Sequence, residues 1–343
     1  MTFRRAVAPV VTIALVAALA CAAVSRAQEP ANTPTPEFVA WLDGVRTEAL
    51  AKGISARTLD RALSGLVPEP VVVERDRAQP EQVQTLDGYL RQRLSARTIS
   101  SARAMYRQHR SVLGRVNTGF GISPSMLVAV WGLDSNFGRF TGTRPTIAAL
   151  ATLAFDPRRS TLFRSELLQA LTILDQGHIT IDELKGSWAG AMGQPQFMPS
   201  SYLKHAVDFD GDGRADIWNT KADVFASIAN YLKTAGWADG ERWGREVRMS
   251  QAVLNRVEKQ VPQRTTGCRA LREMTAARPL EEWSRFGVVL ANGRPLPTAD
   301  MDASLVRGVK RHFLVYRNYH ALIDYNCSNS YAVSAGLLAD SVW

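Results

Sequence analysis

The sequence contains few of the residues from which metal, redox and nucleotide sites are built. It has three cysteines and five histidines in 343 residues, and the histidines form neither an HExxH motif nor a close pair. A zinc site is therefore not expected. No glycine-rich phosphate loop precedes a predicted helix, which argues against nucleotide binding, and no GxSxG motif surrounds a serine, which argues against acyl transfer. We expect no organic cofactor.

Acidic residues are also in short supply. The 32 acidic residues face 41 lysines and arginines, which gives a formal net charge of +9. An excess of this kind suits an anionic partner, such as nucleic acid, an acidic membrane surface or an anionic polymer. Hydrophobic residues, at 46%, are in the range of ordinary globular proteins. The length allows two or three domains.

Residues 1–27 have the features of a Sec signal peptide. Arg4 and Arg5 form a basic start, residues 10–24 are almost wholly apolar, and small residues precede a cleavage point before Gln28. The apolar run is shorter than the roughly 17 residues that a membrane-spanning helix needs. We therefore expect a periplasmic protein with a mature charge of +6. Export excludes nucleic acid as a partner and makes the cell wall the available acidic polymer.

The three cysteines have two expected roles. An alternative to simple cleavage is a lipoprotein signal, in which Cys21 would carry the lipid that anchors the protein to the outer membrane. In either case the mature chain enters an oxidising compartment. Cys268 and Cys327 are then the remaining pair, and we expect a disulfide that closes a loop of about 60 residues.

The apolar pattern divides the mature chain into three parts after a polar lead at 28–36, which we expect to be disordered. Residues 37–120 have helical spacing and predict a helical N-terminal domain. Residues 121–240 are again mainly helical, whereas 241–343 are interrupted by Pro and Gly and predict a small strand- and loop-rich region that ends in a helix. The expected class is α+β, mainly α. Individual elements expected are an extended piece at 71–73, a strand at 313–316 and a helix at 331–342.

A single acid, Asp134, lies near the end of an apolar helix that is predicted to begin at Pro124. It follows a Trp, a Gly and a Leu, so its carboxyl is expected to be partly desolvated. Desolvation raises the pKa of a carboxyl and favours the protonated form, which is the state that a general acid needs. The alternative is an ordinary exposed acid at a helix end.

Residues 187–202 concentrate Gly, Ala, Ser, Pro and Gln in a predicted loop. Small residues allow the backbone to approach a ligand closely, and glutamine amides can hydrogen-bond to the hydroxyl or acetamido groups of a sugar. The alternative is a tight turn between helices, with Trp188, Phe197 and Met198 in the core. We expect both to hold, with the polar residues lining a cleft.

Residues 208–219 have the start of an EF-hand calcium loop, with oxygen ligands at positions 1, 3 and 5 and Gly at position 6. The bidentate Glu expected at position 12 is replaced by Asn219, and Asp223 is a substitute carboxylate. We expect structural Ca²⁺ of weak affinity. The alternative is an Asp/Gly-rich turn without metal.

Four motifs together resemble the membrane-bound lytic murein transglycosylase B family, the lysozyme-like enzymes of bacterial cell-wall turnover. They are residues 131–138, 186–202, 208–219 with 230–231, and 325–332. The resemblance implies a lysozyme-like core within 121–240 that contains an EF-hand-like Ca²⁺ loop. It also implies cleavage of the β-1,4 bond between N-acetylmuramic acid and N-acetylglucosamine in peptidoglycan glycan strands, without water, to leave a 1,6-anhydromuramic end.

By position, Asp134 takes the place of the family's catalytic acid, which is Glu in the family. The shorter side chain withdraws the carboxyl by roughly an ångström, and a misplacement of this size can cost on the order of 10²-fold in rate. The resemblance places Ser187, Gln196, Tyr231, Tyr325, Asn326 and Tyr331 in the glycan cleft. It places Asp208, Asp210, Asp212, Arg214 through its carbonyl, and Asp223 around the metal.

One carboxyl is enough for the implied reaction. Protonated Asp134 would donate to the glycosidic oxygen, the muramic acetamido group would stabilise C1, and ionised Asp134 would accept the C6 hydroxyl proton. Two alternatives are open: a lysozyme-type hydrolase, and a cell-wall-binding protein that is catalytically weak because Asp replaces Glu. We expect a monomer.

Overall fold

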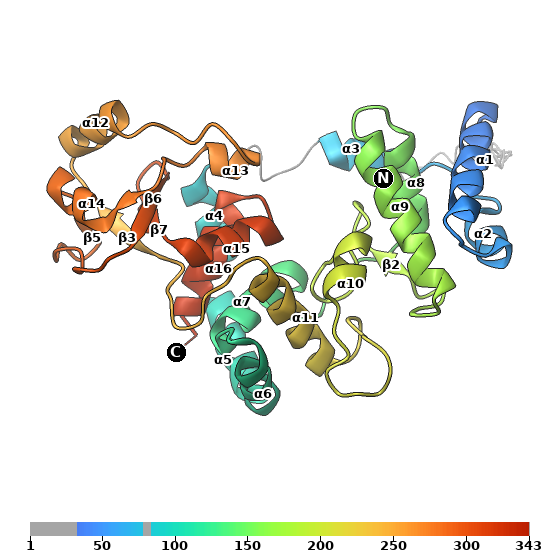
Figure 1. Ribbon diagram of the computed structural model, residues 1–343, viewed down its shortest axis with the longest axis horizontal. Coiled ribbons are helices and arrows are strands. Elements are labelled where there is room, and N and C mark those ends of the chain that lie inside the picture. The colour runs from blue at the N-terminus through green and yellow to red at the C-terminus, as the bar shows by residue number, and fades with distance from the viewer. Residues whose placement is uncertain (1–32, 78–83, 343) are drawn as a thin grey trace, which may run out of the picture. The chain divides into compact units, whose positions relative to one another are not determined.

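Helices dominate the computed structural model, which describes residues 33–77 and 84–342 (Figure 1). The predicted signal peptide, Cys21 and most of the predicted lead lie outside the described residues. The helices of the first half are α1 (Pro36–Ala51), α2 (Ala56–Leu63), α3 (Pro70–Arg77), α4 (Leu86–Arg93), α5 (Ala96–Gln108), α6 (Arg110–Phe120), α7 (Pro124–Ser135), α8 (Thr146–Phe155) and α9 (Ser160–Asp175). Those of the second half are α10 (Pro199–His205), α11 (Lys221–Thr234), α12 (Gln251–Gln260), α13 (Arg269–Arg272), α14 (Leu280–Phe286), α15 (Arg317–Tyr325) and α16 (Asn329–Asp340).

Hydroxyl side chains determine where several of these helices begin. Thr35, Ser55, Ser95 and Ser123 each accept a hydrogen bond from a backbone N–H in the first turn of α1, α2, α5 and α7, respectively. Such caps satisfy donors that the helix itself leaves unpaired. α7 also has Pro124 at its first position, where the missing N–H has no cost.

The valine run at 71–73 is helical, so the predicted extended piece is wrong. These residues belong to α3, which begins at Pro70. Val72 is completely buried in contact with the core around α8, and the Glu69 N–H donates to Thr152 Oγ1 at 2.9 Å. Burial of Val72 and the helix-starting proline outweigh the preference of β-branched residues for extended backbone.

Two helical cores share the stretch from 37 to 120. The first core joins α4–α7, α11, α15 and α16 around Trp131, Phe225 and Tyr319. The second core joins α1–α3, α8, α9 and the loop before α10. The stretch expected to form one N-terminal domain is therefore helical, but its apolar faces are divided: α1–α3 pack in the second core, and α4–α6 pack in the first.

Residues after 241 form a more regular structure than predicted. A five-stranded antiparallel sheet has the order β4-β6-β7-β3-β5 and encloses a third core with α12 and α14 around Trp283. The predicted strand at 313–316 is present as β7, and the predicted final helix is present as α16. The strands of this sheet are β3 (Gly244–Arg248), β4 (Arg278–Pro279), β5 (Val289–Leu290), β6 (Asp302–Arg307) and β7 (His312–Val315), and a separate pair consists of β1 (Arg144–Pro145) and β2 (Lys185–Gly186).

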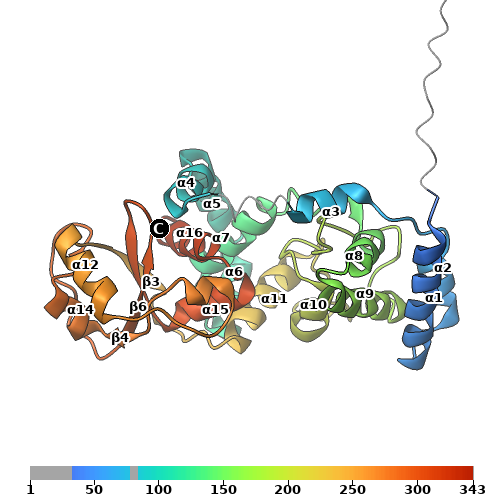
Figure 2. The same ribbon diagram turned by 90° about the horizontal axis from the view of Figure 1, so that it is seen from above.

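The chain returns from the sheet to the first core through α15 and α16 (Figure 2). The expected disulfide between Cys268 and Cys327 is present, with a Cα–Cα distance of 6.4 Å, and it joins the segment before α13 to the α15–α16 turn. Within the described ranges, no single helix is long and apolar enough to cross a membrane; only the pair α6 and α7, bent by 111°, meets that test by length and composition.

Candidate active site

Asp134 is the last residue but one of α7, a helix that is buried on nearly every side. The residue is half-buried and lines a cavity of about 330 Å³. The chain turns sharply just beyond it, because Asn136 and Phe137 both have positive φ values, of 49° and 62°. The cavity is lined by Gln92, Arg93, Thr98, Gly132, Leu133, Asp134, Ser135, Asn136 and Phe140.

Burial raises the pKa of Asp134 from 3.8 to about 7. The phenol groups of Tyr331 and Tyr325 and the guanidinium of Arg93 oppose this rise in the pKa but do not cancel it. Asp134 Oδ2 and Tyr331 Oη are buried with no hydrogen-bond partner among the residues described. A carboxyl of this kind can be protonated near neutral pH and can still donate or accept a proton.

Arg93 is a site residue that the sequence did not reveal. It is the last residue of α4, and its Nη2 donates to the carbonyl of Leu133 at 2.6 Å. This bond holds the last turn of α7 from the side that faces the cavity. Nothing in the sequence distinguishes Arg93 from the neighbouring Arg91 and Arg97, because the contact arises only when α4 packs beside α7.

Three tyrosines form a row that begins beside the Asp134 carboxyl, although none of them is among the residues that line the 330 Å³ cavity. Tyr331 and Tyr325 are parallel, with ring centroids 6.4 Å apart, and Tyr325 is 4.8 Å from Tyr231. Burial raises the pKa of Tyr231 to about 12 and those of the other two well above 10, so all three are neutral. Tyr325 Oη donates to Pro195 O at 2.6 Å, which joins this row to the loop at 187–202.

Within that loop, the two predicted sugar-binding side chains make local bonds. Gln196, which has a φ of 50°, donates through Nε2 to the carbonyls of Thr141 and Gly193 at 3.1 and 2.9 Å. Ser187 Oγ accepts from the backbone N–H groups of residues 189 and 191. Within the described part of the chain, the Gln196 amide oxygen and the Ser187 hydroxyl proton have no hydrogen-bond partner. Asn326 is exposed at the end of α15.

Gln194, rather than Gln196, is the buried glutamine of the loop. Its Oε1 accepts from Trp131 Nε1 at 2.9 Å, and its Nε2 donates to Trp218 O at 2.6 Å. Gly138 lies directly against this amide, where a Cβ would overlap Oε1. The sequence pointed to the glutamines of this loop but not to the one that fixes it to α7.

The predicted metal loop brings three carboxylates together. Asp208, Asp210 and Asp212 each offer an oxygen within 4.8 Å of the others. Asp208 also accepts hydrogen bonds from the N–H groups of Gly211 and Gly213, both at 2.8 Å, so the loop is already curved around these oxygens. Carboxylate oxygens are the ligands that Ca²⁺ prefers, and this part of the donor set fits the ion.

Asp223 is not part of this group of three. It is completely buried at the start of α11, where Oδ1 accepts from Phe209 N–H and Oδ2 from Asp216 N–H, both at 2.8 Å. It therefore holds the two halves of the loop. The Arg214 carbonyl accepts a hydrogen bond from the N–H of Asp216 at 3.0 Å.

Residues 37–340 match the family described as the transglycosylase SLT domain. The chain belongs to this family. Over 155 residues it is 37% identical to the membrane-bound lytic murein transglycosylase B of Escherichia coli K12, a match that covers 45% of this chain and 43% of that relative. The matched region thus spans less than half of the relative's length.

Solved structures of transglycosylases extend the similarity to most of the chain. SltB3 from Pseudomonas aeruginosa, in complex with NAG-anhNAM-pentapeptide, is 41% identical, with 89% of this chain and 79% of that chain covered and a TM-score of 0.79. Slt35 from Escherichia coli, in complex with calcium, is 26% identical, with 90% and 92% covered and a TM-score of 0.72. The predicted α+β, mainly α class with a lysozyme-like core is confirmed.

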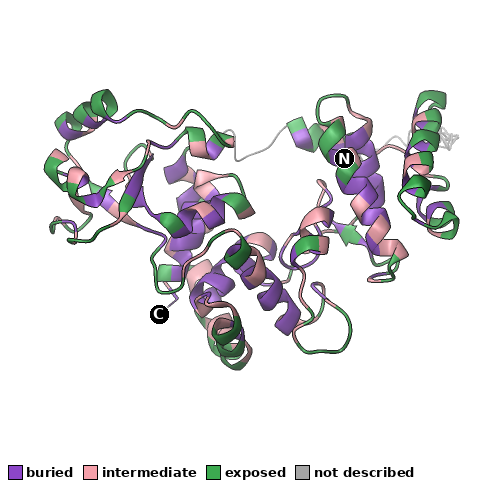
Figure 3. Cartoon of the chain, viewed as in Figure 1, coloured by how far each residue is buried: buried purple, intermediate pink, exposed green. Residues whose placement is uncertain are grey.

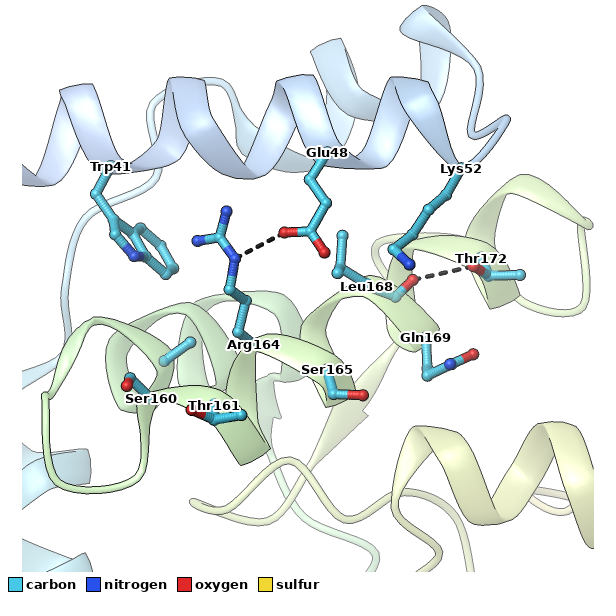
Figure 4. Close-up of a pocket in the computed structure, with 11 residues that line it drawn as sticks. Trp41, Glu48, Lys52, Ser160, Thr161, Arg164, Ser165, Leu168, Gln169 and Thr172 are labelled. Atoms are coloured by element: carbon cyan, nitrogen blue, oxygen red, sulfur yellow. Dashed lines mark hydrogen bonds and ion pairs between the residues drawn. The ribbon is translucent and has the colours of Figure 1, made fainter.

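A second cavity lies between α1 and α9 (Figure 4) and has a volume of about 460 Å³. Its single acid, Glu48, is paired with Arg164 at 2.8 Å, and the guanidinium lies 5.5 Å from the Trp41 ring centroid. The Glu48 carboxyl is therefore already engaged in an ion pair, whereas Asp134 Oδ2 has no hydrogen-bond partner among the described residues. The cavity at Asp134 is therefore the better candidate for acid chemistry.

Proposed function

We propose that this protein is a lytic transglycosylase that cleaves the MurNAc-β-1,4-GlcNAc bond of peptidoglycan and forms a 1,6-anhydromuramic end. The observation that carries the proposal is the carboxyl of Asp134, which is unpaired at Oδ2, has a pKa raised to about 7 and lines a cavity in a member of the transglycosylase SLT family. The ligand NAG-anhNAM-pentapeptide in the similar SltB3 structure supports the same chemistry.

Asp134 acts first as the general acid. Its proton passes to the glycosidic oxygen as the bond from C1 to that oxygen breaks, and the 2-acetamido carbonyl oxygen of the muramic residue stabilises the positive C1. Ionised Asp134 then accepts the proton of the C6 hydroxyl while O6 forms a bond to C1. The carboxyl ends protonated, no water is consumed, and a second carboxyl is not required.

The neutral tyrosines suit this cycle. Because Tyr325 and Tyr331 retain their protons, their electrostatic effect on the ionised carboxyl is limited to that of phenol dipoles. We assign these two, with Tyr231, Ser187, Gln196 and Asn326, to the wall that holds the glycan. This wall would increase the rate mainly by holding the C6 hydroxyl close to C1.

The loop at 208–212 is proposed to bind Ca²⁺ in a structural role, with Asp208, Asp210 and Asp212 as side-chain ligands. We assign Asp223 to fixing the loop and retain it, with the Arg214 carbonyl, as a further candidate ligand. The calcium complex of the similar Slt35 supports this assignment. The ion would stiffen the segment between α10 and α11, and Tyr231 lies on α11.

We place the enzyme in the periplasm, acting as a monomer on peptidoglycan. This location rests on the predicted signal peptide, with lipidation of Cys21 as its alternative. Mass spectrometry of the mature N-terminus distinguishes the two, since cleavage before Gln28 removes Cys21 and lipidation retains it.

Product analysis on purified peptidoglycan tests the activity. Wild type, Asp134→Asn and Asp134→Glu are incubated with sacculi, and the released muropeptides are identified by mass. We expect 1,6-anhydro ends from wild type, none from Asp134→Asn, and faster release from Asp134→Glu, whose longer side chain reaches the family position. Asp182→Asn, at an exposed acid after α9, is the matched control and should release products as wild type does.

Two results would overturn the proposal. Reducing muramic ends in place of anhydro ends would identify a hydrolase that uses water. Binding to sacculi by all variants, with no muropeptides from either the Asp or the Glu form, would identify a cell-wall-binding protein.

A further inference from the structure

Helices α5 and α6 carry an unusual charge distribution. No Asp or Glu occurs between Asp87 and Asp134, although this stretch contains many arginines. Five of these arginines lie on α5 and α6, and all five are exposed. Figure 3 shows exposed segments on these helices. We call these five arginines the arginine surface: Arg97, Arg103, Arg107, Arg110 and Arg115.

These charges are not neutralised within the protein. Among residues 33–77 and 84–342, none of the five arginines forms an ion pair. Arg103 Nε donates to the Ser341 carbonyl at 2.8 Å, and the Arg115 guanidinium lies 5.6 Å from the Phe209 ring centroid. Several arginines elsewhere do form ion pairs, as Arg164 does with Glu48.

The arginine surface lies on helices that adjoin the cavity at Asp134. Thr98 on α5 and Arg93 just before it both line that cavity. Both α5 and α6 pack against α7, and the three helices lie side by side in Figures 1 and 2. A polymer that occupies the cavity therefore has exposed guanidinium groups on the neighbouring helices.

We propose that the arginine surface binds the carboxylates of peptidoglycan peptide stems and so holds the polymer beside the cavity. The inference rests on the proposed function and specifies the part of the substrate that lies outside the cleft. Arginine forks match carboxylate geometry, and a cluster of unpaired cations raises the local concentration of an anionic polymer. Each exposed contact is weak and screened by salt, so the effect depends on several charges together.

An acidic membrane surface is the competing partner, and the structure disfavours it. Helices that lie on membranes insert large apolar side chains beside their cations. The exposed large apolar residues of the described chain are Val39, Leu50, Val71, Phe140, Leu162 and Val309, and none is on α5 or α6.

A pelleting assay with intact sacculi tests the inference separately from catalysis. All proteins carry Asp134→Asn, so that sacculi are not digested during binding. The test variant adds Arg97→Gln, Arg107→Gln and Arg110→Gln, which are exposed and form no ion pair among residues 33–77 and 84–342. The matched control adds Arg256→Gln, Lys259→Gln and Arg294→Gln, three exposed cations after β3 that remove the same charge. Thermal unfolding confirms that all three proteins are folded.

We expect the test variant to bind sacculi about tenfold more weakly than the parent at low ionic strength. The difference should shrink as salt is raised to several hundred millimolar. The control should bind as the parent does. Sacculi from which an amidase has removed the peptide stems should bind parent and test variant equally.

Equal binding of test and control variants to intact sacculi would overturn the inference. So would a loss of binding to vesicles of anionic phospholipid with binding to sacculi unchanged, which would identify a membrane partner. Neither outcome depends on the reaction products, so the proposed transglycosylase activity stands or falls separately.

Discussion

Asp134 lies where burial outweighs the opposing effect of two phenols and a guanidinium, so its pKa rises from 3.8 to about 7. Between about pH 4 and pH 7, Asp134 therefore keeps its proton in the native state but has lost it in the unfolded state. Stability falls as pH rises through this range and is constant above it. At 1.36 kcal/mol per pKa unit the loss is at most about 4 kcal/mol.

Asp134→Asn is therefore expected to stabilise the protein at pH 8, by about 1–3 kcal/mol, while it abolishes turnover. At pH 4 the two proteins should have nearly the same stability, because native Asp134 is then neutral. Urea unfolding at both pH values is the measurement. Asp182→Asn, at an exposed acid, serves as the control and should leave the free energy of unfolding unchanged at both pH values. A less stable Asn variant at pH 8 would contradict the burial argument.

Arg93 offers a second test at the level of single residues. Its positive charge lowers the pKa of Asp134, so Arg93→Gln should raise that pKa further. In the proposed mechanism turnover requires protonated Asp134, so it should decline as the pH rises through about 7. The falling limb of the kcat profile should therefore move to higher pH in Arg93→Gln, although kcat itself falls because Leu133 loses its hydrogen bond.

Arg93→Lys separates the two effects. Lysine keeps the positive charge but lacks the planar guanidinium group. The falling limb of the kcat profile should therefore move less in Arg93→Lys than in Arg93→Gln. A limb that moves to lower pH in Arg93→Gln would show that the charge of Arg93 does not act on Asp134.

The acidic loop between α10 and α11 gives a prediction for one element. Ca²⁺ that binds only the folded state stabilises it by about 2.7 kcal/mol at one hundred times its Kd. Thermal unfolding in excess Ca²⁺ should occur several degrees above unfolding in EGTA. Asp210→Asn should remove this difference, whereas Asp300→Asn, at an acid outside the loop, should keep it. Equal midpoints in Ca²⁺ and EGTA for wild type would reject the assignment.

Elements with strong local signals could be predicted from the sequence. Ser55, Ser95 and Ser123 are the N-cap residues that begin α2, α5 and α7, and the apolar run before Trp343 is α16. Local signals were weaker at 71–73, where β-branched residues follow a proline. There the burial of Val72 against another part of the fold favours the helical conformation.

The division of residues 37–120 between two cores was not visible in the sequence. The apolar faces of α1–α3 and of α4–α6 have the same helical spacing, and spacing does not specify the partner of a face. The same limit applies to the site. Asp134 and the loop at 187–202 have distinctive motifs, but Arg93 and Gln194 acquire their roles only through contacts with distant segments.

At the scale of the whole molecule, the candidate site lies where the two helical cores meet. Asp134 and Tyr331 come from the first core, whereas Phe197 comes from the second. Tyr325 contacts both cores. The geometry of the site therefore depends on how firmly the cores are joined.

Gln194 makes one such joint, between Trp131 of the first core and the carbonyl of Trp218, which packs on the second. Gln194→Leu leaves the buried indole N–H unpaired, and we expect a loss of about 2 kcal/mol in urea unfolding. Because the loop would no longer be fixed to α7, muropeptide release should fall by at least tenfold under conditions where the variant is fully folded. Gln108→Leu, at an exposed glutamine of α5, should change neither quantity. If Gln194→Leu were as stable and as active as wild type, the cores would be held in register by their apolar contacts alone.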